Sequence, residues 1–236
     1  MATLYDLVPD HITLFALEPE ELAGIALELL NSGTGPSRLH PTSFSHPDTL
    51  GPFPPHVRNE VAEVLFEGWH WLVHEGFIGP RPDDTHGWHY ITRRGKKLRT
   101  REDLAAYVNS VILPRKLLHP AIAAACWSAF LRGDYDTAVF QATKELEVGI
   151  REAGKFSAED YGVKLARKAF GETGPLADST KPTSERNALA DLMAGTLGSY
   201  KNPHSHRKVK LSAEEAVEMV MLASHLLKIV DARAAP

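Results

Sequence analysis

The second half of the chain is a succession of helical patterns with short breaks, and this constrains the fold more than any other feature. Apolar side chains recur there at helical spacing over five stretches, namely residues 120–132, 135–153, 158–170, 183–200 and 213–232. Breaks separate them at Gly133-Asp134, at residues 171–182 and at Asn202-Pro203. Amphipathic helices joined by short connections bury their apolar faces against one another. The sequence therefore predicts an antiparallel helical bundle over residues 114–236.

The first 113 residues predict a second module, which is also mainly helical but includes a small β-hairpin. Helical patterns begin near Pro19, His56 and Glu102. Residues 33–55 are rich in Pro, Gly, Ser, Thr and His, and they predict an irregular loop or linker. A helix that leads directly into two short β-type runs, within residues 77–92, resembles the end of a winged helix-turn-helix domain. The whole chain is thus predicted to be mainly α, with a winged-helix-like module over residues 1–113.

Composition and charge exclude some classes of protein. The chain has 43% hydrophobic residues, as globular domains do, and its net charge of −4 argues against nonspecific coating of nucleic acid. Its single cysteine, Cys126, lies in an apolar run and excludes an intramolecular disulfide, so we expect a packed thiol in a reducing compartment. Neither a signal-peptide pattern nor an apolar run long enough for a membrane span is visible. We therefore expect a cytoplasmic protein with no membrane partner.

A run of cations follows the predicted hairpin. Residues 93–101 carry six Lys or Arg in nine positions, whereas residues 1–115 as a whole have ten Lys and Arg against fifteen Asp and Glu. One interpretation is a nucleic-acid phosphate clamp that uses Arg93, Arg94, Lys96 and Lys97. The other is a solvated surface that balances the acidic helices before it, and the residues alone leave both open.

A second cationic segment lies between the last two predicted helices. Residues 200–207 contain Lys201, His204, His206 and Arg207, and no acidic side chain occurs between residues 191 and 214. With no local carboxylate to neutralise it, this segment should attract an anion, most plausibly a phosphate. We therefore expect His204 and Arg207 to contact a nucleic-acid backbone there.

No metal or cofactor is expected. His70 and His74 have the i, i+4 spacing of helical zinc ligands, but the glutamate of zinc proteases is missing between them. His204 and His206 have no obvious third ligand. Walker loops, dinucleotide-binding glycine patterns and nucleophile elbows are all missing from the sequence.

Several short motifs resemble one protein family. The run from Phe130 through Asp134-Tyr135 to Val139 is similar to the first-helix signature of HEPN-type bundles, and residues 142–147 continue it. Gly162-Val163-Lys164-Leu165 and the stretch from Gly195 to His206 resemble a bacterial branch, the Ymh-type proteins of unknown function. The resemblance covers about residues 115–232, and residues 56–98 match the N-terminal half of the same branch.

The HEPN resemblance implies a dimeric helical bundle, and many such domains are metal-independent ribonucleases that act in phage defence or as toxins. Their motif is Arg followed after four to six residues by His, often with Asn after the Arg. The matching positions are Lys201, Asn202 and His206. His206 would act as general acid or base, Lys201 as the cation that stabilises the phosphate, and Asn202 would orient a phosphate oxygen. Lysine replaces the expected arginine, however, and it lacks the bidentate fork.

Two hypotheses follow. The first is a metal-independent HEPN-type endoribonuclease in which a two-fold dimer of the bundle brings two copies of the motif together, with RNA as substrate and an antitoxin or other protein as partner. The second is a catalytically inactive regulator or interaction protein whose winged module binds nucleic acid or protein. Lys144, Glu147 and Arg151 share a helix face that would line the site, although a pair such as Glu147 and Arg151 is more often a plain surface ion pair.

Overall fold

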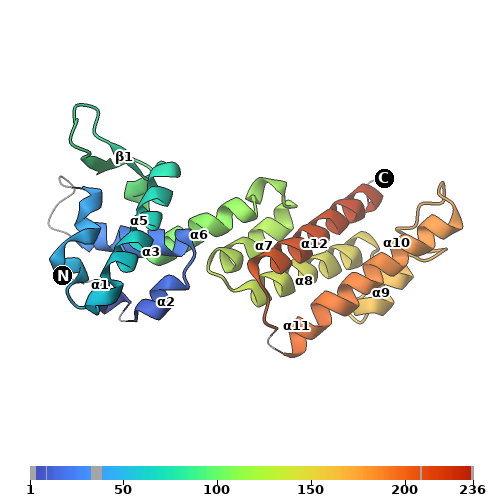
Figure 1. Cartoon of the computed structure of the whole chain (residues 1–236). Coiled ribbons are helices and arrows are strands. Elements are labelled where there is room, and N and C mark those ends of the chain that lie inside the picture. The colour runs from blue at the N-terminus through green and yellow to red at the C-terminus, as the bar shows by residue number, and fades with distance from the viewer. Residues whose placement is uncertain (1–3, 9, 33–38, 208, 235–236) are drawn as a thin grey trace. The chain divides into compact units, whose positions relative to one another are not determined.

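The computed structural model describes residues 4–8, 10–32, 39–207 and 209–234, apart from the side chains of Ser32, Ser205 and His206 (Figure 1). It is mainly helical with one small antiparallel sheet, as predicted. The chain divides into two compact units, residues 1–108 and 109–236, and each has its own apolar core. In the part of the chain that the structure covers, no helix is long and apolar enough to cross a membrane.

The N-terminal unit is built around two packed helices, α3 (Pro19–Ser32) and α5 (Arg58–His74). They approach closely because Gly68 of α5 has no side chain: a Cβ there would lie 2.6 Å from the carbonyl carbon of Leu22 in α3. Shorter elements surround the pair, and they are α1 (Leu4–Leu7), α2 (His11–Phe15), η1 (Pro41–Ser45), α4 (Pro47–Leu50), η2 (Pro55–Val57) and η3 (Gly95–Lys97). Helix α6 (Arg101–Ile112) ends the unit and continues past its boundary.

Residues 39–55 differ from the irregular loop that their composition predicts. They form the short helices η1 and α4, and these are capped by the side chains of His40 and His46. Phe44 is buried against Trp69 of α5, with ring centroids 5.7 Å apart. Burial of such apolar side chains orders a segment that its Pro and Gly content alone would leave irregular. Residues 33–38, the rest of the predicted loop, lie outside the described residues.

The predicted hairpin is present as β1 (Ile78–Pro80) and β2 (His89–Ile91), which pair antiparallel with Ile78 opposite Ile91. It follows α5 directly, because Gly76 takes a φ of +72° and turns the chain after the helix. The hydroxyl of Thr92 donates to the carbonyl of Gly76 at 2.7 Å, which ties the end of the hairpin to that turn. Leu39 forms an isolated bridge with His89 and so extends the sheet by one contact.

The C-terminal unit is a helical bundle centred on α8 (Tyr135–Ala153), which packs against α7 (Pro120–Leu131) and α12 (Ala213–Ala234), while α9 (Gly162–Phe170) packs against α10 (Thr183–Thr196) (Figure 1). The short helix η4 (Arg115–Leu117) precedes α7. Gly133 takes a φ of +78° in the tight connection from α7 to α8, which agrees with the predicted break. Helix α9 begins at Gly162 rather than at residue 158, and Gly162 itself takes a φ of +61°.

The predicted break at Asn202-Pro203 is wrong. Helix α10 continues through a π-helical turn, η5 (Leu197–Lys201), into α11 (Asn202–His206), as the unbroken ribbon in Figure 1 shows. A proline inside a helix lacks an N–H donor and clashes with the carbonyl four residues earlier. In the wider π turn, the N–H of Asn202 donates to the carbonyl of Leu197. This shifts the backbone carbonyls that come immediately before Pro203 in the helix. The helix therefore bulges where we expected it to end.

Candidate functional site

The end of the α10–α11 helix is attached to α8 by a buried carboxylate, Glu147. One of its oxygens accepts from Lys201 Nζ at 2.9 Å and from the Gly162 backbone N–H at 2.6 Å. The other oxygen accepts from Arg151 Nη2 at 2.9 Å. The Glu147 side chain is only 6% exposed, whereas those of Lys201 and Arg151 are 17% and 23% exposed. Two cations from different helices thus share one buried anion.

Local sequence explains how this arrangement forms. Glu147 lies on the face of α8 that also buries Leu146 and Ile150, so the helix directs its carboxylate inward. Gly162 begins α9, where a backbone N–H has no acceptor within the helix, and its left-handed conformation aims that N–H at Glu147. Arg151 is one turn further along α8 and is held in addition by the carbonyl of Asp160, to which its Nε donates at 3.0 Å.

The protonation state of Glu147 follows from its partners. Burial by itself raises the pKa of this carboxyl, but hydrogen bonds from Lys201 and Gly162, together with the charges of Lys201 and Arg151, bring the pKa below its ordinary value. Glu147 is therefore ionised at neutral pH. The cluster then contains two positive charges, on Lys201 and Arg151, and one negative charge, on Glu147. Its net charge is therefore +1.

His204 also attaches α11 to α8. Its Nδ1 lies against the carboxylate of Asp136 in the first turn of α8, and its side chain is only 3% exposed. We expected His204 to face a nucleic acid, but the structure places its ring in the interior of the unit. Contact with a phosphate would first require the His204–Asp136 pair to break.

The remaining candidate residues of this segment have different surroundings. Asn202 and Arg207 are exposed, and the side chain of His206 lies outside the described residues although its backbone ends α11. The expectation that nothing neutralises this segment holds only for sequence neighbours. Glu147 and Asp136, which are 54 and 68 residues away in the chain, supply the carboxylates that the segment itself lacks.

The cations after the hairpin fall into two groups. Arg94 is engaged within its own unit, since it donates to the carbonyl of Glu75 at 2.6 Å and to the hydroxyl of Tyr107, and its guanidinium lies 4.7 Å from the ring centroid of Phe77. The side chains of Arg93, Lys96 and Lys97 are exposed, and they form no salt bridge with any described residue. Arg94 is thus a structural contact, and the other three remain available to a ligand.

The sequence carried no sign of Asp136 as a partner, and it carried no sign that Glu147 is buried. Asp136 looks like an ordinary first-turn carboxylate of α8, which favours the helix dipole, and nothing in its neighbourhood indicates a histidine partner. Glu147 and Arg151 were expected to share a face with Lys144, but Lys144 is exposed while Glu147 is buried. Opposite charges at i, i+4 in a sequence do not indicate whether the ion pair is buried, because its burial depends on how the neighbouring helices pack.

No metal centre is visible among the described side chains. The structure gathers no group of three His, Cys, Asp or Glu there that would hold an ion. His70 and His74 are both exposed on α5. Cys126 is fully buried, so the expectation of a packed thiol is confirmed, and this burial raises the pKa of the thiol to about 11.

Comparison with known proteins gives one match, which lies in the C-terminal unit. Residues 116–230 match the model of a family described as "Protein of unknown function (Hypoth_ymh)". No curated protein and no solved structure gave a match to the chain. The matched residues run from before α7 into α12 and include Glu147, Arg151 and Lys201. The bundle of this protein is therefore similar to the Ymh-type proteins, whose function is unknown.

Proposed function

We propose that the C-terminal unit is a HEPN-type bundle that cleaves RNA without a metal, and that its site lies at the end of α11. The observation that carries the proposal is the Glu147 cluster, where Lys201 and Arg151 meet on one carboxylate and leave a surplus positive charge. Asn202 and Arg207, from the same segment as Lys201, are exposed. Such a group of fixed cations suits a phosphodiester, whose negative charge grows in the transition state. A π turn that ends on the first motif residue, Lys201, also accords with a functional segment.

Arg151 compensates for the arginine that the motif lacks. In the described part of the chain, its Nε and Nη2 are bound to Asp160 and Glu147, and no bond is seen at Nη1. A guanidinium has five N–H donors, so Arg151 can hold Glu147 and still donate to a phosphate oxygen. Lys201 provides a point charge, and Arg151 provides the planar donor set that a lysine cannot. The two side chains together would do what one motif arginine does.

The proposed reaction moves two protons. One imidazole removes the proton of the ribose 2′-hydroxyl, and the 2′-oxygen forms a bond to phosphorus. The bond from phosphorus to the 5′-oxygen then breaks, and a protonated imidazole gives its proton to that oxygen. The products are a 2′,3′-cyclic phosphate and a 5′-hydroxyl, with no metal required. His206 from each of two protomers would supply the base and the acid, so the proposal includes a two-fold dimer.

The test is RNA cleavage by the purified full-length protein in the presence of a chelator. Replacing His206→Ala should lower the cleavage rate by about 100-fold or more, because general acid–base catalysis contributes that much. His225→Ala is the matched control, since His225 is an exposed histidine on α12 outside the motif. Light scattering on both variants should still show a dimer. Equal cleavage by wild type and His206→Ala, or cleavage that stops when metal is chelated, would contradict the proposal.

A second function, in which the winged-helix-like module binds nucleic acid and the bundle is inactive, is favoured by a different observation. Lys201 is already neutralised by Glu147, while Arg93, Lys96 and Lys97 are exposed after the hairpin. This function predicts duplex binding that weakens steeply with salt. The double variant Lys96→Ala/Lys97→Ala should reduce the salt slope by about two, and Arg115→Ala/Lys116→Ala, another adjacent exposed pair, should leave it unchanged. If both pairs behave alike, the run after the hairpin is ordinary surface.

A further inference from the structure

Tyr161 is an exposed aromatic residue in the connection between α8 and α9. It is 65% exposed, whereas every other Phe, Tyr or Trp that the structure describes in the C-terminal unit is buried or half-buried. A single exposed ring is ordinary on a protein surface. What distinguishes Tyr161 is that its backbone is held on both sides by residues of the Glu147 cluster.

The residues before and after Tyr161 both contact α8. The carbonyl of Asp160 accepts from Arg151 Nε at 3.0 Å, and the N–H of Gly162 donates to Glu147 at 2.6 Å. Tyr161 between them is extended, with φ −151° and ψ 165°. In extended backbone the carbonyl before a residue and the N–H after it face the same side, so both bonds hold Tyr161 against α8. The Cα that carries the ring is therefore held at two adjacent peptide groups.

The rest of the connection is held by its own contacts. The Asp160 carboxylate accepts from Lys168 Nζ at 2.8 Å and from Ser157 Oγ at 3.3 Å. The hydrogen bond from Lys168 lowers the pKa of Asp160, so this carboxylate is ionised at neutral pH. Lys168 Nζ also lies 4.9 Å from the ring centroid of Phe156. A connection held in this way needs little reordering when a ligand binds, which lowers the cost of binding.

Tyr161 and the cations of the cluster lie close together. From the Cα of Tyr161 a backbone step of ~2.4 Å leads to the Gly162 nitrogen, and two hydrogen bonds of 2.6 and 2.9 Å lead on through Oε2 of Glu147 to Lys201 Nζ. That Cα is therefore no more than about 8 Å from Lys201 Nζ. Proteins bind single-stranded nucleic acid by combining positive charges for the phosphates with flat aromatic rings for the bases.

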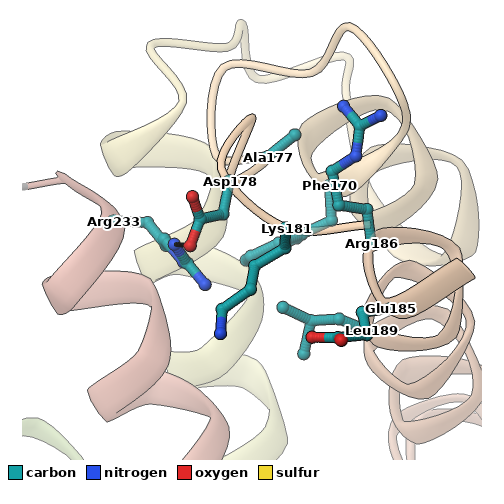
Figure 2. A pocket seen from close by; sticks show the side chains of 8 residues that line it. All are labelled: Phe170, Ala177, Asp178, Lys181, Glu185, Arg186, Leu189 and Arg233. Atoms are coloured by element: carbon teal, nitrogen blue, oxygen red, sulfur yellow. Dashed lines mark ion pairs between the residues drawn. The ribbon is translucent and has the colours of Figure 1, made fainter. Parts of the chain in front are cut away.

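The pocket of the C-terminal unit offers no comparable ring. It has a volume of about 210 Å³ and is formed by the end of α9, residues 171–182, the first turns of α10 and the last turn of α12 (Figure 2). Phe170 lines it but is only 1% exposed and belongs to the bundle core. The head groups of Lys181 and Arg186 point to opposite ends of the pocket in Figure 2, so they do not converge on one ligand.

We propose that Tyr161 stacks on a base of the RNA whose phosphate lies at Lys201 and Arg151, so that the site takes single strands rather than duplexes. The faces of paired bases are covered by their neighbours in a helix, and only an unpaired base can be splayed out onto an aromatic ring. Every base has a π face, so this contact selects single strands without selecting a sequence. This role rests on the proposed function for the position of the phosphate.

The test is binding of a fluorescein-labelled single-stranded RNA with 2′-O-methyl riboses to the full-length protein, measured by fluorescence anisotropy. Methylation removes the attacking hydroxyl, so the probe is bound but not cleaved. Tyr161→Ala should raise the Kd about tenfold, because stacking of one base on an aromatic side chain contributes on that order. Tyr161→Phe keeps the ring and should bind within about twofold of wild type. Equal Kd values for Tyr161→Ala and wild type would overturn the proposal, and so would a wild type that does not bind the probe.

Two further probes and one control variant separate stacking from other effects. An abasic ribose–phosphate chain and a duplex of the same sequence should each bind wild type and Tyr161→Ala equally, because neither offers an unpaired base. The same loss with the abasic chain would mean that the substitution disturbs the cations, and the same loss with the duplex would contradict the selection of single strands. Tyr5→Ala removes another exposed tyrosine, from α1 of the N-terminal unit, and should leave the Kd unchanged.

Cleavage of unmodified RNA distinguishes a failure of this role from a failure of the proposed function. Tyr161→Ala should raise KM about tenfold and change kcat by less than about twofold, since stacking acts in the bound state and the transition state alike. His206→Ala should instead lower kcat. If wild type cleaves RNA and Tyr161→Ala has an unchanged KM, the stacking role is wrong and the ribonuclease stands. If wild type binds the probe without cleaving RNA, the ribonuclease is wrong and the Kd of Tyr161→Ala still decides the stacking role.

Discussion

At the residue scale, Glu147 holds the C-terminal unit together where the motif lies. It is a buried carboxylate that receives a lysine, an arginine and a backbone N–H from three segments of the bundle. Burying charge is unfavourable unless every partner is present, so removal of one member leaves the others uncompensated. The three contacts make the position of Lys201 depend on α8 and α9 rather than on its own segment.

We predict that Glu147→Gln lowers the free energy of unfolding by about 3 kcal/mol at pH 7, because two partly buried cations lose their counter-ion. The folded-state pKa of Glu147 is lowered, so its contribution is present above the ordinary pKa of 4.5 and is lost as the pH falls through the folded value. The difference between wild type and Glu147→Gln should therefore shrink below pH 4.5. Urea unfolding at several acidic pH values measures this difference in the free energy of unfolding. Glu218→Gln is the control, since Glu218 is exposed on α12. A difference that stays constant with pH would show that the charge of Glu147 is not what stabilises the fold.

Cys126 offers a second prediction at this scale. Its thiol is fully buried in α7 and its pKa is raised to about 11, so almost no thiolate exists at neutral pH. A chromogenic thiol reagent should therefore react with the native protein only as fast as the C-terminal unit unfolds, and should titrate one thiol in denaturant. Immediate reaction of the native protein would mean that the α7 face is open.

At the element scale, two helical features depend on single residues. The α10–α11 helix passes Pro203 through a π turn, which displaces Lys201 and Asn202 from the register that a regular helix would give. Helices α3 and α5 approach one another closely because position 68 is glycine. In both places the local geometry of the helices depends on one residue.

Gly68→Ala and Gly195→Ala should have opposite effects. The new Cβ at position 68 would meet backbone atoms of Leu22 and Ala23, so α3 and α5 must separate, which costs about 1–3 kcal/mol. At position 195 nothing lies within 4 Å of the new Cβ, so alanine should stabilise α10 by about 1 kcal/mol. Thermal unfolding, monitored by tryptophan fluorescence and circular dichroism, measures the stability of both variants. Stability of Gly68→Ala equal to wild type would mean that α3 and α5 are less closely packed than described.

At the scale of the whole molecule, the two units have separate cores, and the division falls inside α6. Asn109, near the end of α6, belongs to the second unit. Its amide donates to the carbonyls of Phe130 and Leu131 at 3.2 and 3.3 Å, and its oxygen accepts from the hydroxyl of Tyr135 at 3.0 Å. Leu113 is also fully buried in the second core.

This division predicts how fragments behave. A fragment of residues 104–236 should fold alone and melt cooperatively, because it keeps Asn109 and Leu113. A fragment of residues 114–236 should be less stable by about 3 kcal/mol or more, since it loses three hydrogen bonds and one buried leucine. Urea unfolding monitored by circular dichroism compares the free energies of unfolding of the two fragments. Equal stability would place the boundary of the second unit at residue 114.

The sequence by itself determined the longer helices of this protein. The helices predicted from Pro120 onward appear with nearly the same limits, and the hairpin after α5 appears where its β-type runs predict it. These are local properties, since apolar spacing, Gly and Pro placement and turn residues act over a few positions. The same local signals were wrong at residues 41–50 and at Pro203, where burial of Phe44 and the π turn overrode them.

Only the tertiary structure decided the candidate site. The candidate residues Lys201 and His204 were found in the sequence, but their carboxylate partners Glu147 and Asp136 come from a helix more than fifty residues earlier. Which carboxylate meets which cation depends on how α8, α9 and the π turn pack, and electrostatic energy depends on that distance and on burial rather than on position along the chain. The pocket beside Phe170 has the same origin, since it requires the end of α12 to lie against the connection between α9 and α10.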